Sequence, residues 1–363
     1  TSLRDIWKPS PLSPPFSMLH FAGRVHLLYL IGHSLIIFSS ATQETCIEAA
    51  QDEIEDPEGQ NLAVSLMQKK SVSVHARSGL TPKDMRYLDL VRDTLTGSVL
   101  RTPEVQPDQG DISTLRQTPF NETNRLNGMG WCQECFTMAG GARVQNVREL
   151  VEKTISENIP GDFLEAGAWR GGCSIMARTV QMTMDQGANR RTYVCDSFSG
   201  LPLSSNKQDG DYWSKMKFLE VSQEEVEQNF KSFQALDSNV QFRKGYFSDT
   251  MPVIRQELKQ QGRQLAVLRG DGDMYESYMD ILYNLYDSIA AGGYFICDDC
   301  PTIPEAQRAI DDFRAHHGIS SPFQTIHSHM GLFWQKEKTS SSVDYDWYLK
   351  WNATRIFNKK PSP

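Results

Sequence analysis

Beyond Gly161 the sequence alternates short apolar segments with longer stretches of helical periodicity, and this alternation limits the fold more than any other feature. Strands separated by helices of about 12–15 residues lie parallel in one sheet, with a helix crossing over between each pair. The expected strands are 163–165, 192–195, 240–242, 265–268 and 294–297, with helices at 173–185, 222–234, 275–289 and 303–316 and an antiparallel pair at 323–326 and 331–334. We therefore expect an α/β protein with a doubly wound, mostly parallel sheet that ends in an antiparallel strand.

The composition agrees with a globular protein of this kind. The chain has 363 residues, of which 39% are hydrophobic, and a net charge of −8. This allows one large domain or two modest ones. The acidic balance argues against sequence-independent nucleic-acid binding, which requires an excess of Lys and Arg. No stretch reaches the roughly 18 uninterrupted apolar residues of a typical membrane-spanning helix.

Before the alternating region the character of the sequence changes several times. Residues 43–85 are polar with mixed charge and suit a linker, 86–100 have helical spacing, and 103–119 are loop-like. A strongly periodic helix follows from Val144, with Asn146 as its expected N-cap. The predicted organisation is a leader with linker at 1–85, a helical cap at 86–145, the main domain at 146–337 and a polar tail at 338–363.

The leader contains an apolar stretch with the layout of a targeting segment. Residues 18–41 combine a weakly basic start at Met18, an apolar run and a small-residue end, an order that resembles a secretory signal or a short anchor. His33 and Ser34 interrupt the run, so a leader without a targeting role is an equal alternative. A signal would imply the secretory pathway and weak membrane association through 18–41, whereas its absence would imply a cytoplasmic protein. The sequence leaves this choice open.

Two cysteine pairs have C-x-x-C spacing, Cys132 with Cys135 and Cys297 with Cys300. Pairs that together form a zinc site usually lie close in the sequence, whereas these are far apart. Cys297 also ends an apolar run typical of a buried strand. We therefore expect ordinary buried thiols in preference to zinc ligation or disulfide bonds.

The first predicted strand leads into a glycine-rich turn, Glu165-Ala-Gly-Ala-Trp-Arg-Gly-Gly172. In a doubly wound sheet, ligands bind at the carboxyl ends of the strands, and glycines let the backbone approach a ligand closely. The G-x-x-x-G-G spacing differs from the G-x-G-x-x-G of dinucleotide sites. Asp196 follows the second strand, where a carboxylate can bind ribose hydroxyls. This combination is typical of S-adenosylmethionine sites, although a purely structural turn has the same form.

Carboxylates follow the next two parallel strands, with Asp271-Gly-Asp273 after one and Asp298-Asp299 after the other. On neighbouring strands about 5 Å apart, Asp271 would lie within reach of the Asp298–Asp299 pair, and the charges would repel. A divalent cation relieves that repulsion, and all-oxygen ligands favour Mg²⁺, Mn²⁺ or Ca²⁺. The alternative is that some of these aspartates, Asp273 or Asp299 in particular, only cap the helices that follow.

Several segments together resemble the macrocin O-methyltransferase (TylF-type) family, in order and with family-like spacing from about residue 86 to 336. The matching segments are Tyr87-Leu-Asp-Leu, Thr137-Met, Gly161 to Gly172, Asp196 to Pro202, Glu224-Glu-Val with Asn229-Phe, Gly245 to Thr250, Leu268 to Ser277, Gly292 to Asp299 and Gly331 to Trp334. The resemblance implies a class I methyltransferase fold, which is Rossmann-like, with S-adenosylmethionine as methyl donor. It also implies Mg²⁺-dependent transfer to a hydroxyl oxygen.

The resemblance further implies roles for single residues. Asp271, Asp298 and Asp299 would bind the metal. The cofactor would contact Thr137, Met138, Glu165, Gly167, Trp169, Asp196, Ser197, Tyr246, Phe247 and Asp271. Catechol methyltransferases have a lysine base where this chain has Met274. We therefore expect Asp271 to combine metal binding with proton removal, ahead of Asp273 or His327.

The acceptor is less constrained than the methyl donor. A substrate with two neighbouring hydroxyls, on a sugar or a phenol, could chelate the metal. Gly130 and Phe136, in the cap, depart from the family's pattern, so the acceptor need not be an antibiotic sugar. The segment 86–100 is expected to be either a cap element or a homodimer contact. Two alternatives stay open, a nicotinamide-dependent oxidoreductase on a similar sheet and a non-catalytic S-adenosylmethionine-binding domain.

Overall fold

The computed structural model describes residues 27–31, 34–38, 79–108, 111–205, 209–210, 213–327, 330–338 and 342–355. The chain divides into two units, Thr1–Arg77 and Ser78–Pro363. In the first unit, β1 (Leu27–Ile31) and β2 (Ser34–Phe38) pair antiparallel within the apolar stretch of the leader. The other residues of the expected signal and most of the linker lie outside the described residues. Among the described residues, none of the helices has the length and apolarity needed to cross a bilayer.

The second unit is built on a seven-stranded sheet with the strand order β10-β11-β9-β8-β5-β6-β7. Its strands are β5 (Asp162–Ala166), β6 (Thr192–Asp196), β7 (Val240–Lys244), β8 (Leu265–Gly270), β9 (Ile289–Cys297), β10 (Gln324–Thr325) and β11 (Leu332–Gln335). β5 to β9 pair in parallel, whereas β11 runs antiparallel to both β9 and β10. The predicted doubly wound, mostly parallel sheet with a terminal antiparallel strand is confirmed.

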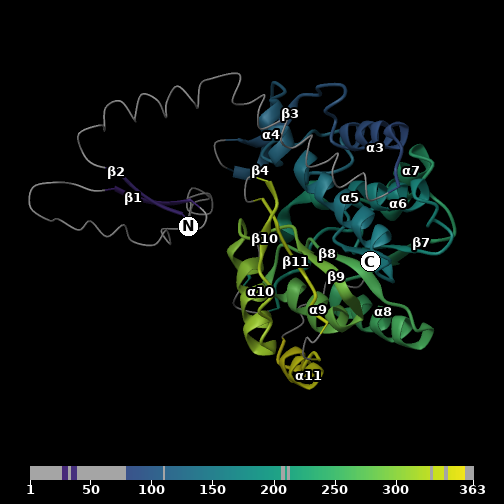
Figure 1. The fold of residues 1–363 in the computed structure, drawn as a ribbon, viewed down its shortest axis with the longest axis vertical. Coiled ribbons are helices and arrows are strands. Elements are labelled where there is room, and N and C mark those ends of the chain that lie inside the picture. The colour runs from purple at the N-terminus through teal and green to yellow at the C-terminus, as the bar shows by residue number, and fades with distance from the viewer. Residues whose placement is uncertain are drawn as a thin grey trace, which may run out of the picture. The chain divides into compact units, whose positions relative to one another are not determined.

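Helices cover both faces of this sheet (Figure 1). Each face has its own buried core. One face carries α3 (Pro82–Leu95), α5 (Gly140–Ser156), α6 (Gly172–Thr183) and α7 (Gln223–Ser232), and the other α8 (Phe247–Gln261), α9 (Tyr275–Leu285) and α10 (Pro304–His317). Shorter elements are α4 (Glu122–Asn127) and the 3-10 helices η3 (Trp213–Lys215), η4 (Lys217–Leu219) and η5 (Tyr286–Ser288). Strands covered on both faces are continuously apolar rather than alternating, which explains why β8 is buried at every residue.

The strand order reverses beside β5, which lies between β6 and β8. Parallel strands end at the same edge of a sheet, so the residues that follow β5 to β9 converge there. Main-chain hydrogen bonds join two of these ends. The Asp271 N–H donates to the Ala166 carbonyl (2.8 Å), and the Asp298 N–H donates to the Gly270 carbonyl (2.9 Å). The segments expected to carry the site are therefore held side by side by the backbone.

Two local predictions in the cap are wrong. The expected loop at 103–119 contains an antiparallel hairpin, β3 (Glu104–Asp108) and β4 (Asp111–Thr118). The helix expected from Val144 begins at Gly140, so Asn146 is a buried interior residue and not the N-cap. Ala139 precedes this helix without a side-chain cap, and for that reason the capping signal in the sequence misplaced its start.

Two helices occupy segments in which no helix was predicted. α8 contains Pro252, and proline normally argues against a helix interior because it lacks the backbone N–H. α11 (Tyr345–Ala353) lies in the polar tail, where Trp347 and Tyr348 stack on Tyr283 of α9 with ring centroids 5.1 and 5.6 Å apart. Aromatic packing on α9 therefore orders a segment whose composition suggests an unstructured end.

Both C-x-x-C pairs form disulfide bonds, so the expectation of buried thiols is wrong. The Cα atoms are 5.1 Å apart in the Cys132–Cys135 pair and 5.6 Å apart in the Cys297–Cys300 pair, separations that suit a disulfide. All four cysteines are nevertheless buried, as expected. Burial is compatible with a thiol and with a disulfide alike, and the sequence context does not distinguish them.

Candidate active site

A cavity of about 280 Å³ lies where the parallel strands end. It is lined by every residue to which the sequence assigns cofactor or metal binding: Thr137, Met138, Glu165, Gly167, Trp169, Asp196, Ser197, Tyr246, Phe247, Asp271, Asp298 and Asp299. Asp273 also lines the cavity, whereas His327 is exposed and is not part of the lining. The structure thus brings together residues that are as much as 162 positions apart, from 137 to 299.

The turn after β5 depends on glycine at one position. Gly167 has φ +96°, and a Cβ atom added there would lie 1.7 Å from the carbonyl oxygen of Asp271. Trp169, with φ +46°, and Gly171, with φ +83°, then direct the chain into α6. The close approach places the turn directly against the backbone of Asp271, the first residue of the predicted metal site.

Asp196, at the end of β6, is hydrogen bonded to the same turn. One carboxylate oxygen accepts from the backbone N–H groups of Ala168 (2.8 Å) and Trp169 (3.1 Å), and the other accepts from the N–H of Phe198 (2.8 Å). Burial raises the pKa of Asp196, although these amide donors oppose the shift. Ser197 donates to the Gly200 carbonyl (2.6 Å) and shapes the adjacent loop. Asp196 therefore fixes the turn while it lines the cavity.

The carboxylates after β8 and β9 form a compact group. Asp271, Asp298 and Asp299 each offer an oxygen, and these oxygens all lie within 4.8 Å of one another. They meet because β8 and β9 are parallel neighbours, with Gly270 opposite Cys297 in register. The prediction that these two strand ends adjoin is confirmed.

Helix capping does not account for these aspartates. α9 and α10 follow Met274 and Ile303, and neither helix has a side-chain hydrogen bond at its N-cap. Asp299 instead accepts from the N–H groups of Gly272 (3.1 Å) and Asp273 (2.9 Å) and from the hydroxyl of Tyr278 (2.8 Å). These bonds hold the Asp299 carboxylate beside the loop that follows β8.

Two buried arginines contact the carboxylates, and sequence reasoning missed both. Arg269 of β8 pairs with Glu165 (2.6 Å), Asp271 (2.9 Å) and Asp298. Arg143 of α5 also pairs with Asp298. A cation within an otherwise apolar strand was an available signal for Arg269. No comparable signal marks Arg143, because arginine is ordinary on an amphipathic helix.

The charges around the cavity do not balance. Its lining contains three guanidinium groups, those of Arg143, Arg269 and Arg355, and eight carboxyl groups, those of Glu165, Asp196, Asp271, Asp273, Glu276, Asp280, Asp298 and Asp299. Burial and neighbouring carboxylates raise the pKa of Asp271 and Asp273 well above the ordinary range, and that of Asp299 to about 6. Burial raises the pKa of Glu165 to about 7. An excess of buried carboxylate oxygens fits the preference of a hard divalent cation.

A second cluster of charged side chains, centred on Arg355, lines another part of the cavity. Arg355, just after α11, donates to Asp280 (2.6 Å), Glu276 (3.0 Å) and the hydroxyl of Ser205 (2.9 Å). All four residues line the cavity. Burial raises the pKa of Asp280 to about 6, against the opposing effect of Arg355. The tail thereby contributes a charged side chain to the site.

Aromatic side chains form a further wall. The rings of Trp131 and Trp169 lie edge to face with centroids 5.6 Å apart, and Trp131 stacks on Phe218 at 5.5 Å. The indole N–H of Trp169 donates to the Phe218 carbonyl (2.9 Å). This wall joins the cap, the glycine turn and the loop after β6.

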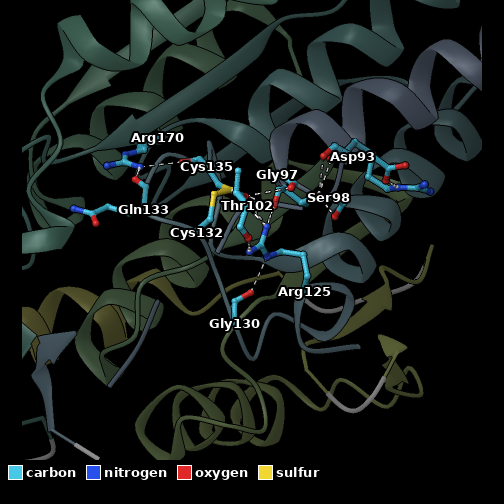
Figure 2. The surroundings of a disulfide bond; sticks show 12 residues. Asp93, Gly97, Ser98, Thr102, Arg125, Gly130, Cys132, Gln133, Cys135 and Arg170 are labelled. Atoms are coloured by element: carbon cyan, nitrogen blue, oxygen red, sulfur yellow. Dashed lines mark hydrogen bonds and ion pairs between the residues drawn. A yellow bond between two sulfur atoms is a disulfide. The ribbon is translucent and has the colours of Figure 1, made fainter. Parts of the chain in front are cut away.

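The Cys132–Cys135 disulfide follows Trp131 directly in the sequence, and Figure 2 shows it between Arg170 and Arg125. Arg170 donates from the glycine turn to the carbonyl groups of Gln133 and Cys135. On the other side, the guanidinium of Arg125 donates to backbone carbonyls of the cap. The disulfide loop thus connects the cap to the turn at the end of β5.

The strand order, the glycine turn beside β5 and the acid at the end of β6 define the class of protein, a class I methyltransferase. Comparison with known proteins then gives the family. The macrocin O-methyltransferase (TylF) family model matches residues 84–336, and the chain belongs to this family. It follows that the protein is an S-adenosylmethionine-dependent O-methyltransferase, and the nicotinamide-dependent alternative is set aside.

Characterised relatives support the same assignment. Demethyldecarbamoylnovobiocin O-methyltransferase of Streptomyces niveus is 37% identical over 69% of this chain and 94% of its own length. Mycinamicin III 3''-O-methyltransferase of Micromonospora griseorubida is 33% identical over 69% of this chain and 96% of its own. Among solved structures, the O-methyltransferase NovP superimposes with a TM-score of 0.62 at 35% identity, covering 70% of this chain and all of that one. α11 and Arg355 lie beyond the residues that the family model matches.

Proposed function

We propose that this protein transfers the methyl group of S-adenosylmethionine to a hydroxyl of a small diol-like acceptor, a sugar or a phenol, and that the transfer depends on Mg²⁺. The proposal rests on the group formed by Asp271, Asp298 and Asp299, whose oxygens lie within 4.8 Å of one another. This group lines the same cavity as the glycine turn.

The three aspartates would hold the cation with their carboxylate oxygens. When bound, Mg²⁺ would polarise the acceptor oxygens and lower the pKa of the hydroxyl. Arg143 and Arg269 would keep Asp298 oriented, because each donates to a different oxygen of that carboxylate. Carboxyl groups outnumber arginines in the cavity lining, and a dication would offset part of this excess.

The methyl donor would occupy the part of the cavity beside the glycine turn. Glu165, Gly167 and Trp169 would border its methionine end, with Thr137 and Met138 over it from the cap. The ribose would lie against Asp196 and Ser197, and the adenine beside Tyr246 and Phe247. Two features support this placement: Gly167 allows close backbone approach, and Asp196 lies within hydrogen-bonding distance of the turn.

Asp271 is our candidate for the proton acceptor. S-Adenosylmethionine would supply the methyl group to the acceptor oxygen and would leave as a neutral thioether, and Asp271 would take the proton that the hydroxyl loses. Asp271 adjoins Gly167 and belongs to the carboxylate group, so it is close to both reactants. Asp273 also lines the cavity and is the runner-up. Holding the reactants in line would supply much of the rate enhancement.

A glycoside suits the cavity as acceptor. A third relative, 35% identical over 70% of this chain, is named as a 4'-O-methyltransferase of a rhamnosyl-tetracenomycin. Trp131 and Phe218, which line the cavity, would offer apolar surface against which a sugar or phenol ring packs. A non-catalytic binding domain is the less favoured alternative. Metal-dependent catalysis explains why carboxylates are grouped in the cavity, whereas cofactor binding alone does not require the group.

Calorimetry tests the proposal. Titrating S-adenosylmethionine and Mg²⁺ into wild type and Asp298→Ala should show metal binding only in the wild type. Cofactor affinity of the variant should stay within about tenfold, or roughly 1.4 kcal/mol. Methyl transfer to vicinal diols should be lost in Asp298→Ala. A variant with wild-type turnover in Mg²⁺ would refute the assigned metal site.

A further inference from the structure

The two candidate metal ligands that follow β9 lie inside a disulfide loop. The sequence is Cys297-Asp298-Asp299-Cys300, and the bond joins the first and last of these residues. Asp298 and Asp299 are therefore the two residues that the disulfide encloses. Their position depends on how that short loop is closed.

The disulfide lies in the hydrophobic core. Cys297 and Cys300 are both fully buried, and both belong to the core that α8, α9 and α10 share with the sheet. Cys297 lies in register between Gly270 of β8 and Leu332 of β11. Two thiols cannot approach as closely as two bonded sulfurs, so reduction forces them apart in a close-packed interior. The chain between them has to move.

Such a movement acts directly on the carboxylate group. The Asp298 and Asp299 oxygens must converge with that of Asp271, which follows a different strand and whose N–H donates to the Ala166 carbonyl of β5. A shift of the loop therefore changes the distances from the Asp298 and Asp299 oxygens to the Asp271 oxygen, because Asp271 lies outside the loop. Metal sites tolerate errors in ligand distance of only about 0.2 Å.

We propose that the Cys297–Cys300 disulfide positions Asp298 and Asp299, so that the affinity of the site for a divalent cation depends on the thiol redox state. This inference rests on the proposed function, since it assumes that the carboxylate group binds Mg²⁺. The oxidised protein has the higher affinity. A dithiol reductant opens the bond by exchange: one thiolate attacks a sulfur and displaces the other, and the second thiol closes the reductant into a cyclic disulfide. Two electrons pass to the protein, which gains two S–H groups.

The second disulfide provides a matched control. Cys132 and Cys135 have the same spacing and the same burial, but Gln133 and Glu134 between them do not line the cavity. The Cys135 sulfur lies 3.1 Å from the Thr96 carbonyl oxygen, in the cap. Opening this bond removes a disulfide without touching the carboxylate group.

The experiment measures binding of Mg²⁺ alone by calorimetry, and of Mn²⁺ by its paramagnetic resonance signal, to the full chain without cofactor or acceptor. Samples are oxidised wild type, wild type reduced with dithiothreitol until a thiol titration shows four additional thiols, reoxidised wild type, Cys297→Ala/Cys300→Ala and Cys132→Ala/Cys135→Ala. We expect the affinity to fall by about 10- to 100-fold in the reduced protein and in the 297/300 variant, the size of effect seen when groups supporting metal ligands are removed. Reoxidation should restore it, and the 132/135 variant should stay within threefold of wild type.

The outcomes separate this inference from the proposed function. If oxidised wild type binds neither Mg²⁺ nor Mn²⁺, the proposed metal site fails, and this inference fails with it. If it binds them with an affinity that reduction and the 297/300 variant leave unchanged or increase, only this inference is overturned. An equal fall in the 132/135 variant also overturns it, because the effect would then be general destabilisation. S-Adenosylhomocysteine binding reports that each variant is folded. If the 297/300 variant is not, the Cys132→Ala/Cys135→Ala variant, measured before and after reduction, makes the same comparison, because Cys297–Cys300 is then the disulfide that reduction opens.

Discussion

Arg269 offers a direct test of how the buried charges of the site are balanced. Its guanidinium contacts Glu165, Asp271 and Asp298, and the side chain is 2% exposed. Removing one partner of a buried ion pair costs about 3–5 kcal/mol, because the other charge is left uncompensated in the interior. With three carboxylates affected, we expect Arg269→Met to lose about 4 kcal/mol of unfolding free energy at pH 8, a large part of the stability of a typical domain.

The loss should depend on pH, with a sign that follows from proton binding. Without Arg269 the buried carboxyls bind protons more tightly in the folded than in the unfolded state, where their pKa values are about 4. A group with a higher pKa in the folded state stabilises the protein at low pH, and this contribution is lost as the pH rises. Urea unfolding should therefore show a smaller deficit at pH 5 than at pH 8. Arg269→Lys, which keeps the charge, should lose less and show less change with pH. Equal deficits for Arg269→Met at both pH values would refute this reasoning.

Three further predictions concern the same cavity. The pKa of Glu165 is raised from 4.5 to about 7, so the unfolding free energy of wild type should fall by about 3 kcal/mol as the pH rises between these values. Glu165→Gln should remove this fall from the pH profile measured by urea unfolding, and an unchanged profile would contradict the raised pKa of Glu165. Gly167→Ala should cost about 2–4 kcal/mol and abolish S-adenosylhomocysteine binding in calorimetry. Gly262→Ala is its control, because Gly262 has φ +60° with nothing within 4 Å of an added Cβ, so equal effects would argue against the close contact at Gly167. Arg355→Met should lower the unfolding free energy by about 3 kcal/mol at pH 8 and by less at pH 5, since the pKa of Asp280 is already about 6 and would rise further; a melting temperature equal to wild type at pH 8 would contradict this.

The sheet and the outline of the site could be predicted because both follow from local pattern. Strands covered on both faces are mostly apolar, as in β8 apart from Arg269, and polar residues then mark where each strand ends. Asp196, Asp271 and Asp298 each follow a strand of this kind, and parallel strands place such residues at one edge. Adjacency of the strands was the one assumption needed, and the β8–β9 pairing confirms it.

The elements that were missed depend on contacts distant in sequence. α11 owes its order to Tyr283, more than sixty positions away, and its own composition carries little signal. Arg143 reaches Asp298 across 155 positions. The disulfides were missed for a different reason, because C-x-x-C spacing and burial describe thiols and disulfides equally well. Pro252 lies inside α8, although a proline normally argues against a helix interior.

The dependence on metal can be measured most directly as methyl transfer from S-adenosylmethionine to a vicinal diol, with wild type first stripped by excess chelator and then supplied with Mg²⁺. We predict that turnover disappears in the chelator and returns with Mg²⁺, while S-adenosylhomocysteine binding stays within threefold throughout. Undiminished turnover in the chelator would contradict the assignment of Asp271, Asp298 and Asp299 to a divalent cation.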